Sequence, residues 1–114
     1  MDTDALAKIE ANPVLNKLYR SLLAELEKIG AYEVEVKKTS LHIVHNRAFL
    51  GIHPRKDGLL LNIVTNLPIT SERLKSVEKV SANRYHNELI VNETGQVDRE
   101  LLSWVETAYS LTTT

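Results

Sequence analysis

Histidine and arginine are the side chains of this chain best suited to ligand binding or proton transfer. The sequence contains four histidines, and the run "SANRYHNELIV" at residues 81–91 places an arginine two residues before one of them. Histidine donates or accepts hydrogen bonds and changes charge near neutral pH, and arginine matches the geometry of carboxylate and phosphate groups. These residue types predict a site for a small anion or for an acidic group of a partner. The expected ligand-binding residues are His42, His53, Arg55, Arg84 and His86.

A metal site would need these side chains to converge. Zinc takes three or four ligands in a tetrahedral arrangement. His42 and His45 are three residues apart in a stretch with strand character, so their side chains point to opposite faces of a sheet. His42, His53 and His86 converge on one ion only if the last strand lies beside theirs. The sequence therefore predicts neither a metal nor a cofactor.

Catalytic motifs are also weakly represented. The chain has no cysteine and no G-x-S-x-G motif. A nucleophilic pair of Ser40 and His53 would need an orienting acid, for which Glu88 is the one candidate. No catalytic residue is predicted, and the sequence favours a non-enzymatic binding domain over an enzyme.

Length and charge limit the function classes further. A chain of 114 residues is expected to bury one core without disulfides or metal. Fourteen Lys and Arg against fifteen Asp and Glu give a net charge of −1, which disfavours a dedicated nucleic-acid binder. No stretch approaches the roughly 20 apolar residues of a membrane-spanning helix, and the opening "MDTDALAKIEANP" lacks the apolar run of a signal peptide. We therefore expect a cytoplasmic protein with no membrane contact.

Two strong helical patterns lie near the ends of the chain. Asn12 is a good N-cap, Pro13 suits the first helical position, and leucines spaced three and four apart predict a helix over residues 13–29. Asp98 is a second N-cap and precedes an apolar stripe that predicts a helix over residues 98–111.

Between these helices the apolar period changes from 3.6 to 2, which is typical of strands. Alternating runs such as "YEVEVKK" and "RYHNELIV" predict about five strands, and their short connections favour mostly antiparallel neighbours. We predict an α+β two-layer sandwich with the order helix, about five strands, helix, and with both terminal helices on one sheet face. This single domain covers residues 13–112 and follows an N-terminal arm or short helix at residues 1–12.

Two hairpins set the expected register of the central strands. Centring the first hairpin on "NR" places His42 beside Gly51, where no side chain blocks it. Centring the second on "DG", a pair that tolerates the positive φ of a two-residue turn, places His53 opposite Asn62. Side-chain alternation then separates two surfaces. The expected core face carries Leu41, Ile43, Leu50, Ile52, Leu59, Leu61 and Ile63. The expected outer face carries Ser40, His42, Val44, Phe49, Gly51, His53, Asn62 and Val64.

The last strand contributes to both surfaces. Alternation along "RYHNELIV" places Arg84 and His86 on the outer face and Tyr85 and Leu89 in the core. Asn87 falls on the core side, where its amide group needs hydrogen-bond partners.

Several motifs occur together in this chain: Thr39, His42, Phe49, His53-Pro54-Arg55, Arg84-Tyr85-His86-Asn87, Trp104 and Ala108-Tyr109. In this combination, over residues 13–112, the chain resembles a family of small bacterial α+β domains of unknown function, some of which carry the label "predicted transport protein". That family looks related to the YdhG-like and YjbR-like small domains. The resemblance implies terminal helices on an antiparallel sheet, and it implies no reaction.

The predicted function is therefore that of a binding or accessory domain for a small anion or an acidic partner group. Two alternatives stay open. The first is a protein–protein interaction module that forms a homodimer through Phe49, since an exposed aromatic on a sheet face suggests a partner. The second is a hydrolase-like enzyme with His53 or His86 as its general base.

Overall fold

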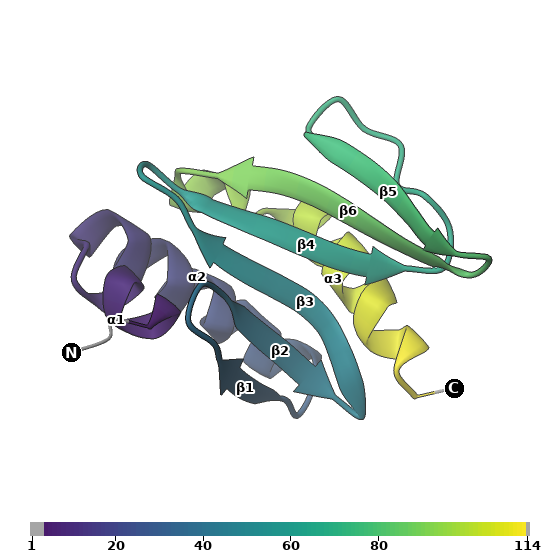
Figure 1. The fold of residues 1–114 in the computed structure, drawn as a ribbon, viewed down its shortest axis with the longest axis horizontal. Coiled ribbons are helices and arrows are strands. Elements are labelled where there is room, and N and C mark those ends of the chain that lie inside the picture. The colour runs from purple at the N-terminus through teal and green to yellow at the C-terminus, as the bar shows by residue number, and fades with distance from the viewer. Residues whose placement is uncertain (1–3, 114) are drawn as a thin grey trace.

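A six-stranded sheet forms the centre of the fold, in a computed structural model that describes residues 4–113 (Figure 1). Its strand order is β1-β2-β3-β4-β6-β5, and every neighbouring pair is antiparallel. The strands are β1 (Glu33–Val36), β2 (Leu41–His45), β3 (Arg47–Pro54), β4 (Leu59–Thr65), β5 (Ser76–Ser81) and β6 (Arg84–Val91). The predicted α+β class is confirmed, with six strands in place of about five.

Helices cover one face of this sheet and leave the other open (Figure 1). They are α1 (Ala5–Glu10), α2 (Pro13–Ile29) and α3 (Arg99–Leu111), with a short 3-10 helix, η1 (Thr94–Gln96), before α3. The expected caps are present: Asn12 Oδ1 accepts from the Val14 and Leu15 amides at 3.0 and 3.2 Å, and Asp98 Oδ1 accepts from the Leu101 amide at 3.0 Å. None of the helices in residues 4–113 has the length and apolar character needed to span a bilayer.

The short helix α1 is part of the core. Ala5 and Ile9 are fully buried, and the Ala5 amide donates to the Lys37 carbonyl at 3.1 Å. This hydrogen bond fastens the start of α1 to the chain just after β1. Residues 1–3 of the expected arm lie outside the described residues.

Strand β5 is the element that sequence patterning missed. All six of its side chains are exposed, so "SVEKVS" has no buried face and shows no apolar alternation. It forms one edge of the sheet, and its pairing with β6 shifts register between Lys79 and Ser81. An edge strand with no core residues gives no hydrophobic signal, which is why the prediction stopped at about five strands.

The first hairpin has the predicted register from Leu41 to Ile43, and a β-bulge changes it after that point. His42 pairs with Gly51 as expected, but the register shifts after Ile43, because β3 contains one extra residue there. The extra residue reverses side-chain alternation and turns Phe49 into the core, where it is 1% exposed. Its ring packs edge-on against Tyr109, with centroids 5.3 Å apart. The placement of Phe49 on the outer face was wrong, and a homodimer through an exposed Phe49 loses its premise.

The second hairpin is offset by two residues from the predicted register. His53 pairs with Leu60, and Gly51 pairs with Asn62, so the expected His53–Asn62 pair is absent. The loop is longer than two residues and is closed by the Arg55 amide, which donates to the Gly58 carbonyl at 2.8 Å. Because the offset is an even number, each side chain keeps its face, and the seven residues predicted for the core face are all buried.

Asn87 finds the partners that its buried position requires. It is fully buried, and its Nδ2 group donates to the Ile63 carbonyl and to Thr65 Oγ1, both at 2.8 Å. Its Oδ1 atom accepts from the Ile69 amide at 3.0 Å. One side chain on β6 therefore holds the end of β4 and the segment that follows it.

The segment between β4 and β5 is also fastened at its far end. Arg73 donates from Nη1 to Asp98 at 2.9 Å and to Glu100 at 3.0 Å, and from Nη2 to the Gln96 carbonyl at 2.8 Å. These contacts tie the segment to the start of α3. The Leu101 amide and the Arg73 guanidinium both lower the pKa of Asp98 because they stabilise its charged form.

Replacing Asn87 tests how much its hydrogen bonds stabilise the fold. We expect Asn87→Ala to lower the free energy of unfolding by about 2–4 kcal/mol, because it leaves buried donor and acceptor groups without partners. Urea denaturation measures this change, with Asn92→Ala, at an exposed position, as the control. An Asn87→Ala variant as stable as the control would contradict this account.

Gly58 tests close packing at the second hairpin, and Gly95, in η1, provides a matched control. A Cβ atom on Gly58 would lie 2.5 Å from the Val91 carbonyl oxygen, whereas a Cβ atom on Gly95 would meet nothing within 4 Å. We expect Gly58→Ala to cost about 1–3 kcal/mol of stability, because backbone must move to relieve the overlap. Gly95→Ala should be neutral or slightly stabilising. Equal melting temperatures for the two variants would show that the hairpin is less constrained than its geometry indicates.

Candidate functional site

The open sheet face carries a pocket that brings together four of the five expected ligand-binding residues. Because β6 lies beside β4, residues far apart in sequence meet over β2, β3, β4 and β6. The pocket has a volume of about 120 Å³. We call it the outer-face pocket, and its lining residues are His42, Ala48, Leu50, Gly51, His53, Asn62, Val64, Arg84 and His86. Arg55 does not line it and is exposed in the loop of the second hairpin.

Gly51 leaves the space between the pocket's polar side chains open. It pairs with His42 on one side and with Asn62 on the other. A Cβ atom placed on Gly51 would lie 3.5 Å from His53 Nε2 and 3.5 Å from the Cβ atom of Asn62. His53 therefore leans over the glycine, and the missing side chain opens the pocket between His53 and Asn62.

Two buried polar atoms at this pocket have no hydrogen-bond partner in the described part of the chain. They are Asn62 Oδ1 and His86 Nε2, which belong to neighbouring strands. An unsatisfied buried polar group costs about 1–3 kcal/mol, so such groups usually mark a place for water, an ion or a ligand. Asn62 was expected on this face but was not among the expected site residues; its expected place beside His53 on the outer face was the signal that could have found it.

The hydrogen bonds of the surrounding residues do not assemble a catalytic pair. Ser40 Oγ lies 3.4 Å from His42 Nε2, and Glu88 Oε1 accepts from Ser76 Oγ at 3.0 Å. Within residues 4–113, His53 has a hydrogen bond to neither Ser40 nor Glu88. The expected partners of a nucleophilic site therefore engage other residues.

Burial and nearby arginines keep the two inner histidines neutral. The pKa of His53 is lowered by burial and then by the charge of Arg55, while Glu88 acts in the opposite direction. The pKa of His86 is lowered by burial and then by the charge of Arg84. Both imidazoles are therefore uncharged at neutral pH, and each can donate from one nitrogen and accept at the other.

The same arrangement does not suit a metal ion. In the range that the structure describes, no group of three His, Cys, Asp or Glu side chains is placed to hold a cation. The histidines of the outer-face pocket share it with the guanidinium of Arg84, whose positive charge repels a cation.

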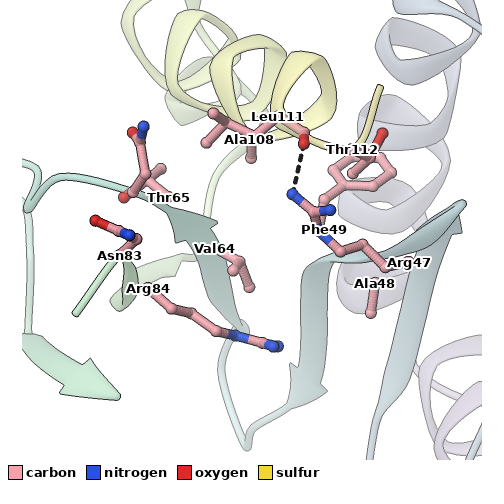
Figure 2. A pocket seen from close by; sticks show the side chains of 11 residues that line it. Arg47, Ala48, Phe49, Val64, Thr65, Asn83, Arg84, Ala108, Leu111 and Thr112 are labelled. Atoms are coloured by element: carbon pink, nitrogen blue, oxygen red, sulfur yellow. Dashed lines mark hydrogen bonds between the residues drawn. The ribbon is translucent and has the colours of Figure 1, made fainter. Parts of the chain in front are cut away.

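A second pocket, which was not expected from the sequence, opens where β3 and β4 diverge. Pairing of these strands ends at Leu50 and Ile63, and the end of α3, with Ala108 and Leu111, runs above the gap in Figure 2. This end pocket has a volume of about 240 Å³. Its lining residues are Arg47, Ala48, Phe49, Val64, Thr65, Asn66, Asn83, Arg84, Ala108, Leu111 and Thr112. No sequence pattern indicates it, because the bulge in β3 decides where Arg47 points.

The lowered pKa values predict how stability depends on pH. The unfolded chain binds protons at its histidines near pH 6.5, whereas folded His53 and His86 resist protonation until a lower pH. Their neutral forms therefore favour the folded state above about pH 6.5, and this stability is lost as the pH falls through the folded-state values.

We expect NMR titration of the imidazole C–H signals to give pKa values below 6.5 for His53 and His86. The double variant His53→Gln/His86→Gln should lose less unfolding free energy than the parent protein as the pH falls below about 6.5, where the unfolded chain takes up protons at these positions and the folded protein does not. Titration of both imidazoles at or above 6.5 would contradict the assigned burial.

Comparison with known proteins gives a family and no activity. No curated protein and no solved structure matches the chain. A family model described as "Domain of unknown function (DUF5655)" matches residues 4–112, which is nearly the whole chain and agrees with an uncharacterised small α+β domain. The chain therefore belongs to the DUF5655 family.

Proposed function

We propose that this domain binds a small anionic group in the outer-face pocket and that it acts as a binding or accessory domain. The observation that carries the proposal is the pair of unpartnered buried atoms, Asn62 Oδ1 and His86 Nε2, in a pocket that also holds Arg84. Arg84 supplies a fixed positive charge and a planar set of donors. A neutral His86 offers a donor or an acceptor to the same ligand.

The size and charge of the pocket support a small group. Its volume of about 120 Å³ is below the roughly 300–1,000 Å³ of typical small-molecule sites, so a carboxylate, phosphate or sulfate group fits it better than a whole cofactor. No carboxylate side chain is among its lining residues in the described range. An acidic group of a partner protein presents the same chemistry as a free anion.

Binding is preferred over catalysis because of how His53 is placed. Its lowered pKa suits a general base, but the Ser40 and Glu88 side chains that would complete a nucleophilic site are bonded to other residues. His53 is therefore assigned to ligand binding. A cytoplasmic, bacterial setting remains the expectation from the sequence.

Arg84 and a matched exposed arginine test the proposal. We expect inorganic phosphate or acetate to raise the melting temperature of the wild-type protein and to shift the backbone NMR signals of Gly51 and Asn62. Arg84→Ala should weaken this binding about ten- to a hundredfold, because a charge-assisted hydrogen bond is worth about 1.5–3 kcal/mol. Arg99→Ala, at an exposed position at the start of α3, should bind as the wild type does.

Gly51→Ala separates ligand binding from stability. Its new methyl group would make ordinary contacts of 3.5 Å, so the fold should be retained while the space between His53 and Asn62 is filled. If Arg84→Ala and Gly51→Ala bind anions as well as the wild type, the site lies elsewhere and the proposal fails.

A further inference from the structure

The outer-face pocket and the end pocket meet along one wall. Three residues line both of them: Ala48 on β3, Val64 on β4 and Arg84 on β6. In Figure 2 the side chain of Arg84 extends beside Val64 from the β6 side, and Arg47 enters the end pocket from β3. The two pockets are therefore adjacent, with these three side chains between them.

The charges of the end pocket favour an anion in spite of the helix end beside it. The last turn of α3 carries about half a negative charge at its carbonyl end. Arg47 already donates to the Leu111 carbonyl, and Asn46 Nδ2 donates to the Thr112 carbonyl at 2.9 Å. Two full positive charges, on Arg47 and Arg84, outweigh that half charge, and no carboxylate is among the described lining residues.

The end pocket also has more hydrogen-bond donors than hydrogen bonds among its described residues. A guanidinium has five N–H groups, and the structure gives Arg47 a bond from Nη2 to one carbonyl. The amides of Asn66 and Asn83 line the same space. Ala48 and Val64 place an apolar strip between this donor-rich region and the histidines of the outer-face pocket.

We propose that the natural ligand is a dianionic molecule with an acidic group at each end and a short apolar middle. One acidic group lies in the outer-face pocket with His86 and Arg84, the middle crosses Val64, and the other acidic group is bound by Arg47 in the end pocket. This inference rests on the proposed function and adds to it the class of ligand. The two pockets joined reach the volume of about 300 Å³ at which small-molecule sites begin.

A series of dicarboxylates of increasing length tests the inference by isothermal titration calorimetry. Butyrate is the monoanionic reference, and succinate, adipate and suberate span the two pockets to different extents; alkane diphosphonates of matching length show whether phosphate-type groups are preferred. We expect one length to bind about tenfold or more tightly than butyrate, because the second contact is then intramolecular. Arg47→Ala should remove this advantage, so that no dicarboxylate binds this variant more tightly than butyrate binds it.

The outcomes separate this inference from the proposed function. If butyrate binds in an Arg84-dependent way but no dianion binds more tightly, the dianion inference is overturned and the proposed function stands. If neither monoanions nor dianions bind, both fail.

If Arg47→Ala does not fold, because Arg47 also caps α3, then Arg47→Lys replaces it and should keep the dianion advantage only in part, since lysine lacks the guanidinium fork. A dianion advantage that is identical in the wild type and the Arg47 variant would also overturn the inference.

Discussion

The hydrogen bonds of Asn87 are the constraint on which the site depends. They hold β6 against the end of β4 through Ile63 and Thr65, and they fix the following segment through Ile69. With β6 in this position, Arg84 and His86 share a face with the histidines of β2 and β3. A polar residue inside the core thus reinforces the β4–β6 pairing that decides which polar residues meet outside it, since side chains alternate along one strand.

The β-bulge in β3 has two structural effects. It turns Phe49 inward onto Tyr109, which adds an aromatic contact to the core beneath the end of the sheet. It also accompanies the divergence of β3 from β4, where the end pocket opens. The same extra residue that removes an aromatic from the open face therefore helps to create a polar cavity beside it.

Local patterns predicted most of this fold, and long-range geometry accounts for what they missed. Caps and apolar stripes located α2 and α3, and alternation located β6 and the need of Asn87 for partners. Period-two patterns cannot reveal a bulge, so Phe49 was assigned to the wrong face. The same patterns assigned four of the expected ligand-binding residues to the sheet face on which the outer-face pocket lies. Arg47 lies in the end pocket because β3 and β4 diverge, and no local pattern encodes that divergence.

The edge strand β5 has a consequence for solubility. A sheet edge offers free backbone groups to any passing strand, and a flat apolar edge promotes ordered aggregation. Here the edge carries a lysine at position 79, next to a register shift that interrupts regular pairing, and all of its side chains face solvent. Charge and local irregularity at an edge both disfavour the addition of another strand. The element that contributes least to the core therefore makes one of the two edges of the sheet a poor template for another strand.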